Sequence, residues 1–146
     1  MFSKPKHGWT DIKIGDFTGC GSYLTDIPLD FLLSAVNAAE NNIPFAMFID
    51  EEGTDLYITA YHYGVVINRF ADEVETYHYF DIEFRDFLLE GVNDIVANLD
   101  DWLWFECGVN VGYNEEDIED DGRYLGNKRE VFIDYISRIT GVFETK

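Results

Sequence analysis

The sequence predicts an α+β fold, a single domain over residues 1–146, with a mostly antiparallel sheet of about five or six strands and three helices packed on it. Two observations predict it. Short apolar stretches separated by small turns follow one another between residues 43 and 80, which is typical of an antiparallel meander. Amphipathic patterns with helical period precede and follow this region. A hydrophobic fraction of 47% with 16% aromatic residues fills a core and excludes intrinsic disorder.

The first part of the chain is expected to form an arm and two strands. Residues 1–8 are predicted to be a loose N-terminal arm, because Pro5 and Gly8 interrupt regular structure. Alternating apolar residues predict a first strand over 9–17, and a second follows over 19–23 after a glycine-containing turn.

A helix is expected next, and then the meander. Thr25 or Asp26 caps the helix, which has Pro28 in its first turn and continues to about Asn42. The runs that predict the four strands of the meander are residues 43–49, 55–63, 65–70 and 74–80.

Two further helices complete the predicted domain. The stretch 81–104 is amphipathic and is expected to extend as a helix to about Phe105, with a short strand at 109–113 after a bend. A polar, acidic loop is predicted over 114–122. The last helix begins at Asn127, where Glu130 completes a capping-box pattern, and ends at Gly141.

The charge of the chain is strongly negative and unevenly distributed. The formal net charge is −19, and residues 50–121 contain 21 Asp and Glu against two basic residues, Arg69 and Arg85. Such a field repels nucleic acid and anionic membranes and attracts basic proteins. No apolar run is long enough to cross a membrane, and no export signal is recognisable, so we expect a cytoplasmic protein with reduced Cys20 and Cys107.

The helix predicted over 81–104 has one carboxylate-bearing face, which we call the acidic stripe. Its members are Glu83, Asp86, Glu90, Asp94 and Asp101. Like charges four residues apart destabilise a helix by roughly 0.2–0.5 kcal/mol per pair. Because no basic residue on this face relieves that cost, the acidic stripe is expected to have a function.

Other patterns are weaker candidates for chemistry. Residues 117–122 begin like a calcium-binding loop, but its twelfth position falls on Lys128 where a glutamate is needed. The tripeptide Tyr-His-Tyr occurs twice, around His62 and His78, and two adjacent histidines still need a third metal ligand. Cys20 lacks a recognisable base. We therefore expect a non-catalytic protein without catalytic residues, metal or cofactor.

The aromatic residues that follow the stripe suggest an interface. Of Trp102 and Trp104, we expect one to fill the core and the other to anchor a partner beside negative charge. The partner-binding residues predicted on this basis are Glu83, Asp86, Glu90, Asp94, Asp101, Trp102, Trp104, Glu115, Glu116, Asp117, Glu119, Asp120 and Asp121.

A small acidic α+β domain without a catalytic constellation resembles the immunity proteins of bacterial toxin–immunity pairs, including those of contact-dependent inhibition systems. The resemblance is one of size, charge and architecture over the whole chain. It implies a tight stoichiometric complex with a basic toxin domain, often a nuclease, whose cleft the inhibitor covers. The electrostatics agree, because a cleft lined with Lys and Arg for phosphate accepts carboxylates as well.

Two alternatives remain at this point. A phage-type nucleic-acid mimic that inhibits a DNA-binding protein uses the same electrostatics, since one acid per helical turn lies roughly 5–6 Å from the next. A structural or regulatory domain needs its charge only for solubility. The sequence leaves the oligomeric state open.

Overall fold

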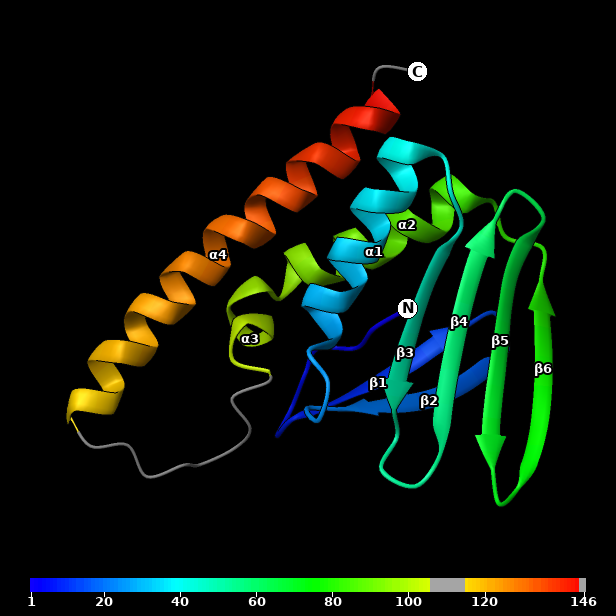
Figure 1. Cartoon of the computed structure of the whole chain (residues 1–146), viewed down its shortest axis with the longest axis horizontal. Helices are drawn as coiled ribbons and strands as arrows, with labels where there is room; N and C mark the ends of the chain where they lie inside the picture. The colour runs from blue at the N-terminus through cyan, green and yellow to red at the C-terminus, as the bar shows by residue number, and fades with distance from the viewer. Residues whose placement is uncertain (106–114, 145–146) are drawn as a thin grey trace.

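The computed structural model describes residues 1–105 and 115–144, with the backbone alone for 115–126. Within these residues it forms six strands in two antiparallel sheets and four helices (Figure 1). This confirms the predicted α+β domain, but the strands form two sheets and not one, and there are four helices and not three. In chain order the elements are β1 (Trp9–Ile14), β2 (Phe17–Ser22), α1 (Ile27–Asn41), β3 (Phe45–Asp50), β4 (Asp55–Tyr61), β5 (Gly64–Ala71), β6 (Val74–Phe80), α2 (Phe84–Ala97), α3 (Leu99–Leu103) and α4 (Glu115–Glu144).

The predicted meander forms the larger sheet, in the order β3-β4-β5-β6. Its strands alternate between two faces, so each row of paired residues belongs to one face. One inner row runs through Met47, Ile58, Ile67 and His78. The first three of these are buried, which gives the meander one face toward the core and an outer face toward solvent.

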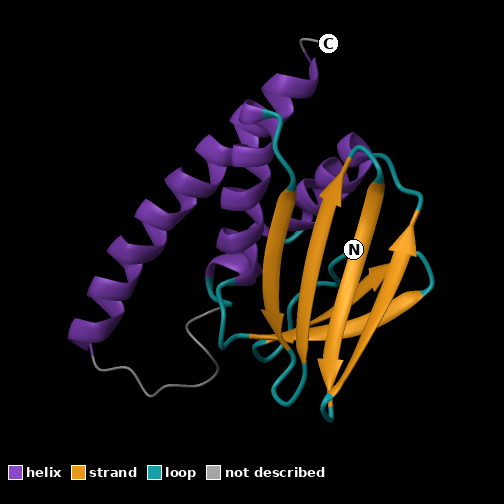
Figure 2. Ribbon diagram, turned by 45° about the vertical axis from the view of Figure 1, so that its right-hand side comes forward, coloured by secondary structure: helices purple, strands orange, loops and turns teal. Residues whose placement is uncertain are grey.

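The inner face is covered by two different layers. The β1–β2 hairpin crosses behind the meander at a steep angle, and α1 and α2 cover the rest of this side (Figure 2). At the centre, the ring of Phe31 from α1 lies against those of Phe45 from β3 and Phe87 from α2. Each large apolar side chain buried in this way contributes about 1.5–3 kcal/mol.

Helix α1 begins and ends where local signals predict. Asp26 is the cap, and its side chain accepts a hydrogen bond from the Leu29 N–H, with Pro28 in the first turn. Asn42 ends the helix in the left-handed conformation at φ 54°. The cap therefore falls on Asp26 and not on Thr25.

The helix predicted over 81–104 is interrupted. It is divided at Asn98 into α2 and α3. The Asn98 N–H donates a hydrogen bond to the Ile95 carbonyl. In an unbroken helix it would donate to the Asp94 carbonyl, which here accepts a hydrogen bond from the indole N–H of Trp102 at 3.3 Å. The break thus lets Trp102 turn into the core.

The last helix is longer than predicted at both ends. The α4 backbone begins at Glu115, so most of the predicted acidic loop is helical, and the start at Asn127 was wrong. The predicted end at Gly141 was also wrong, because Phe143 is buried and the helix continues to Glu144. The predicted strand at 109–113 and Cys107 lie outside the described residues.

The first residues do not form a loose arm. Phe2 is only 6% exposed, with its ring against those of Phe31 and Trp102. Backbone hydrogen bonds from Ser3 to Asp11 and from Lys13 to Met1, at 3.0 and 2.8 Å, hold the segment along β1. Pro5 and Gly8 interrupt regular structure locally, but the apolar ring of Phe2 ties this end of the chain into the core.

Candidate functional site

The acidic stripe lies on the solvent-facing side of α2 and α3. Glu83, Asp86, Glu90 and Asp101 are exposed, as predicted from the helical pattern. Arg85 from the same helix is also exposed. These four carboxylates form the solvent-accessible part of the stripe.

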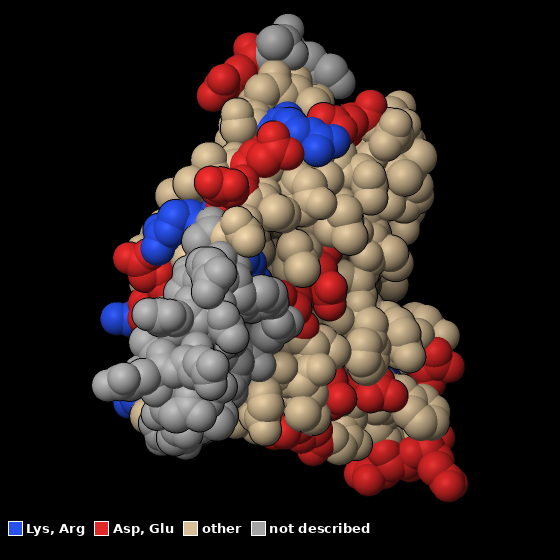
Figure 3. Space-filling model, turned by 60° about the vertical axis from the view of Figure 1, so that its left-hand side comes forward, with Lys and Arg blue, Asp and Glu red and all other residues tan. Residues whose placement is uncertain are grey.

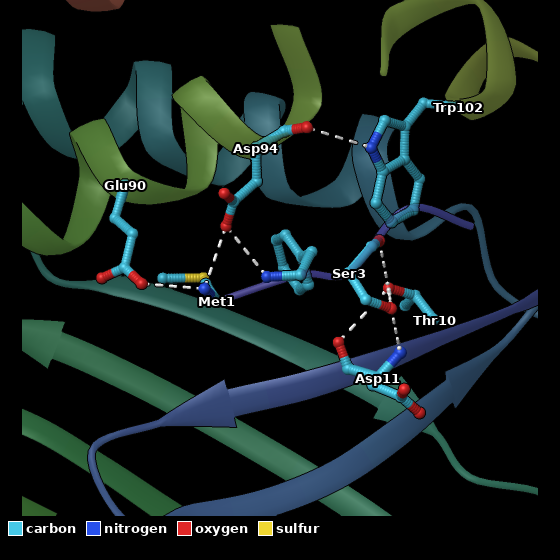
Figure 4. Close-up of polar contacts among 8 residues, drawn as sticks. Met1, Ser3, Thr10, Asp11, Glu90, Asp94 and Trp102 are labelled. Atoms are coloured by element: carbon cyan, nitrogen blue, oxygen red, sulfur yellow. Dashed lines mark hydrogen bonds and ion pairs between the residues drawn. The ribbon is translucent and has the colours of Figure 1, made fainter. Parts of the chain in front are cut away.

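The N-terminal segment occupies the middle of the stripe (Figure 4). The Met1 amino group lies 2.8 Å from Glu90 and 2.9 Å from Asp94, and the Phe2 N–H donates to Asp94 at 2.9 Å. Further along, Lys4 lies 3.8 Å from Asp101. The like charges of Glu90 and Asp94 are therefore balanced by an ammonium group between them, which no pattern within the helix reveals.

Asp94, one of the predicted partner-binding residues, has a structural role. Its carboxylate is engaged by the N-terminal segment and its carbonyl by Trp102. Burial lowers the pKa of the Met1 amino group, but its hydrogen bonds to the Glu90 and Asp94 carboxylates outweigh it and leave this pKa above the ordinary value. The ammonium form is the one that the two carboxylates hold.

The two tryptophans divide as expected, one inside and one outside. Trp102 is 0% exposed, so its assignment as a partner-binding residue was wrong. Trp104 is 48% exposed and follows α3 next to the stripe. Trp104 is thus the exposed tryptophan next to the stripe.

The predicted acidic loop is not a loop in its backbone. Its residues belong to the first turns of α4, and their side chains lie outside the described part of the structure; they are Glu115, Glu116, Asp117, Glu119, Asp120 and Asp121. The calcium-like pattern falls in this same stretch. A helical backbone is not the turn that a calcium loop requires.

Cations of α4 pair with nearby carboxylates on the side of the molecule formed by α1 and α4. Arg138 lies 2.6 Å from Glu40 and 3.3 Å from Asp134, and Arg129 pairs with Asp100. Figure 3 shows basic and acidic groups next to one another along these helices. This side therefore presents ion pairs and not a single-sign field.

In the described part of the chain, carboxylates without basic partners gather at one end of the meander, where the β3–β4 and β5–β6 turns lie. We call its six carboxylates the acidic sheet end: Asp50, Glu52, Asp55, Asp72, Glu73 and Glu75. Among the described residues, none of the six forms a salt bridge with a Lys or Arg.

Aromatic side chains cover the outer face of the meander next to this end. By strand alternation Phe48, Tyr57, Tyr77 and Tyr79 share that face, and the three tyrosines are exposed. Sequence reasoning missed this surface. The signal was available, because strand alternation in the meander places these rings on the same face as Asp50, Asp55 and Glu75 of the acidic sheet end.

Arg69 is the basic residue within the meander, and it is engaged internally. It donates two hydrogen bonds to Glu51, at 3.1 and 2.8 Å, and its guanidinium lies over the Phe17 ring. Burial raises the pKa of Glu51, but hydrogen bonds from Arg69, Thr54 and the Cys20 N–H outweigh it and leave this pKa below the ordinary value. This cluster joins the hairpin to the meander.

Cys20 is not activated as a nucleophile. Its thiol faces the Glu51 carboxylate at 3.7 Å. Burial raises the pKa of the Cys20 thiol, and the negative charge of Glu51 raises it further. Since the thiolate is the reactive form, this environment opposes nucleophilic chemistry.

The two Tyr-His-Tyr histidines lie in different environments. His62, in the β4–β5 turn, contacts Asn42 and the Phe84 ring, whereas His78 in β6 lies against Phe17. In the described part of the chain, no three His, Cys, Asp or Glu side chains are arranged to hold a metal ion.

A pocket of about 420 Å³ lies where the end of α1, the β4–β5 turn and the start of α2 meet. Its polar lining comes from Asn42, His62, Glu83 and Arg85, with Phe84 and Phe143 as apolar walls. Among the described residues, the lining includes no serine, threonine or cysteine. Arg85 and His62 supply nitrogen donors to this lining, and Glu83 supplies a carboxylate.

None of the helices in the described part of the chain combines the length and apolar character of a membrane span. Comparison with known proteins adds no identification: no protein-family model, no curated protein and no solved structure matches this chain.

Proposed function

We propose that this protein is a non-catalytic binding protein whose partner is a basic protein, in the manner of an immunity protein that neutralises a toxin domain such as a nuclease. The observation that carries the proposal is the distribution of unbalanced carboxylates. In the described residues, Lys128, Arg129 and Arg138 of α4 each pair with a carboxylate, whereas the acidic sheet end has no such cation. A net charge of −19 adds a long-range field that attracts a basic partner.

Two surfaces support this binding. On the stripe, Glu83, Asp86, Glu90, Asp101 and Trp104 are exposed, so carboxylates lie next to an aromatic anchor. On the meander, the acidic sheet end lies next to the exposed tyrosines of the outer face. Aromatic anchors supply most of an interface's binding energy, while surrounding charges accelerate association and select the partner.

Nucleic-acid mimicry receives less support. A mimic needs a regular row of carboxylates available to its target. In this protein the row is interrupted at Asp94, whose carboxylate is engaged by the N-terminal segment.

The proposal is tested with a toxin domain encoded next to this protein's gene. Complex formation is measured as association rate and Kd over a range of salt concentrations. Charge reversal on the stripe, Glu83→Lys with Asp86→Lys, or at the sheet end, Glu52→Lys with Glu73→Lys, is expected to weaken binding by about tenfold or more, mainly through the association rate.

The matched control is Glu130→Lys with Glu144→Lys on α4, which changes the net charge equally on the other side of the molecule. This control should retain most of the affinity. Equal losses in all three double variants contradict a specific docking surface, and salt-independent binding contradicts the electrostatic basis of the proposal.

A further inference from the structure

The β6 strand forms an open edge of the meander. In the described residues β6 is the last strand of its sheet, and Figure 1 shows it at the margin of the molecule. It pairs with β5 from Val74 to Phe80 without a bulge, and it contains no proline and no lysine. Natural edge strands are commonly protected by such features, so an unprotected edge of this length invites strand pairing.

The turn before β6 determines which backbone groups are unpaired. Asp72 and Glu73 both have positive φ, 51° and 65°, as in a type I′ two-residue turn. Such a turn closes with a hydrogen bond between its flanking residues, here Ala71 and Val74. Because antiparallel pairs alternate, the N–H and C=O groups of Glu75, Tyr77 and Tyr79 point away from β5.

The side chains of these same three residues lie on the outer face. Tyr77 is 66% and Tyr79 59% exposed. Glu75 accepts a hydrogen bond from Asn68 at 2.6 Å, and the Tyr79 hydroxyl donates to the Tyr63 carbonyl. The edge therefore presents unpaired backbone groups beside aromatic and carboxylate side chains that neighbouring strands hold in place.

A second copy of this chain fits the edge poorly. One antiparallel register pairs all seven β6 residues of one copy with those of the other. In it Tyr77 lies opposite Tyr77, and Val74 lies opposite Phe80. Continuing that register by one residue places Glu73 of each copy opposite Asp81 of the other. Like charges directly opposite one another destabilise strand pairs, and both ends of the pair carry this repulsion.

The edge suits a basic segment instead. We propose that the open edge of β6 binds an extended, lysine- or arginine-containing segment of the partner protein by strand addition. The inference rests on the proposed function, because the same basic partner supplies the segment. The backbone of Glu75, Tyr77 and Tyr79 pairs with the segment, a basic side chain lies opposite Glu75, and an aromatic or apolar group lies opposite Tyr77.

The test uses a synthetic peptide, Lys-Thr-Lys-Val-Tyr-Val-Lys-Thr-Lys, labelled with fluorescein at one end. In antiparallel pairing its tyrosine lies opposite Tyr77, one lysine lies opposite Tyr79, and the other three lie opposite Glu75, Glu73 and Asp81. Binding to the whole protein is measured by fluorescence anisotropy. Hydrogen exchange followed by NMR should show new protection at the amides of Glu75, Tyr77 and Tyr79, and little change at Thr76 and His78.

Two N-methylated peptides separate strand addition from charge attraction. Methylation of the tyrosine and its two nearest lysines removes the donors that face β6 and should weaken binding by about tenfold or more. Methylation of the two valines alters groups that point away from β6 and should leave binding within about threefold of the parent peptide. Equal binding of both methylated peptides overturns strand addition.

A pair of protein variants gives the complementary test. Tyr77→Pro removes an N–H that points away from β5, so the β5–β6 ladder is retained, whereas Tyr77→Thr keeps the N–H and removes only the ring. Peptide binding should be lost in Tyr77→Pro and weakened less in Tyr77→Thr. If Tyr77→Pro fails to fold, the peptide pair decides the question alone.

Failure of this inference is distinguishable from failure of the proposed function. If the toxin domain binds with the expected salt dependence but Tyr77→Pro binds it as tightly as Tyr77→Thr does, strand addition is wrong and the acidic docking function remains. If the lysine peptide shows no binding even at low salt, the β6 edge is not the site. If the peptides behave as predicted and no basic protein binds, the proposed function is wrong.

Discussion

The backbone N–H of Phe2 donates a hydrogen bond to the Asp94 carboxylate at 2.9 Å, across 92 positions of the sequence. This contact holds the N-terminal segment against α2, and the Phe2 ring then fills the space between Phe31 and Trp102. A carboxylate that appears as surface charge in a helical pattern is thereby part of the domain's internal architecture.

Removal of the Asp94 carboxylate should destabilise the fold. Asp94→Ala leaves the Phe2 N–H without its acceptor and removes one of the two carboxylates near the Met1 amino group. We expect a loss of about 1–3 kcal/mol in the free energy of unfolding, measured by urea denaturation. Asp86→Ala, on the same face but exposed, should change stability by no more than about 0.5 kcal/mol. Equal effects contradict the structural role of Asp94.

The ion pair between Lys128 and Asp26 should be among the most sensitive sites in the protein. The two groups lie 2.7 Å apart, both side chains are buried, and the pair joins α4 to the cap of α1. Lys128→Ala leaves a buried carboxylate without this cation, so we expect a loss of about 3–5 kcal/mol or failure to fold.

Arg129→Ala, one residue further along α4, is the matched control for Lys128→Ala. It breaks an exposed pair with Asp100, and its expected cost is at most about 1 kcal/mol. Thermal or urea unfolding of both variants measures how much stability the buried pair and the exposed pair each contribute. A cost for Lys128→Ala no greater than that for Arg129→Ala excludes a strong contribution from the buried pair.

Two helical glycines should respond to alanine in opposite directions. A Cβ at Gly91 in α2 overlaps the ring of Phe31, so Gly91→Ala should destabilise by about 1–3 kcal/mol through overpacking. A Cβ at Gly141 in α4 meets no atom of the described residues within 4 Å apart from its chain neighbours and the backbone of its own helix, so Gly141→Ala should stabilise by about 0.5–1 kcal/mol. Differential scanning calorimetry measures both shifts. A destabilising Gly141→Ala contradicts the helical continuation of α4 beyond this residue.

The Glu51 cluster predicts a pH dependence of stability. The folded-state pKa of Glu51 is depressed, because hydrogen bonds from Arg69, Thr54 and Cys20 outweigh the effect of burial. Its contribution is therefore fully present above the unfolded-state value, about pH 4.3, and is lost as the pH falls through the folded-state pKa. Between about pH 2 and 5, the free energy of unfolding measured with urea should fall less steeply with decreasing pH in Glu51→Gln than in the parent protein.

Glu52→Gln is the control for this measurement, because Glu52 is the exposed neighbour of Glu51. In this variant the free energy of unfolding should depend on pH in the same acid range nearly as steeply as in the parent protein. If the free energy of unfolding depends on pH equally in Glu51→Gln and the parent protein, the folded state does not lower the pKa of Glu51. That result contradicts a stabilising role for the hydrogen bonds that Glu51 accepts.

Much of the local structure was predictable from the sequence, since its signals act over a few residues. Apolar alternation located the meander strands, and the strand predicted at 74–80 matches β6 residue for residue. The Asp26 cap, Pro28 and the left-handed Asn42 bound α1 as expected. The exposed face of α2 was likewise predictable, because helical period alone separates Glu83 and Asp86 from Leu88 and Val92.

Tertiary contacts decided what local patterns do not contain. Helical period places Asp94 on the stripe, but only the packed N-terminal segment makes it structural. The sequence does not distinguish Trp102 from Trp104, whose environments depend on the break at Asn98 and on the position of Phe2.

The same distinction applies to the candidate binding surface. By itself, the sequence determined a strongly acidic α+β domain, because net charge and periodicity are sums over residues. Only the fold decided which carboxylates meet cations and which remain unbalanced, since Arg69 and Arg138 pair with acids 18 and 98 residues away. Charge balance at a surface depends on distance in space, and that distance exists only once the chain has packed.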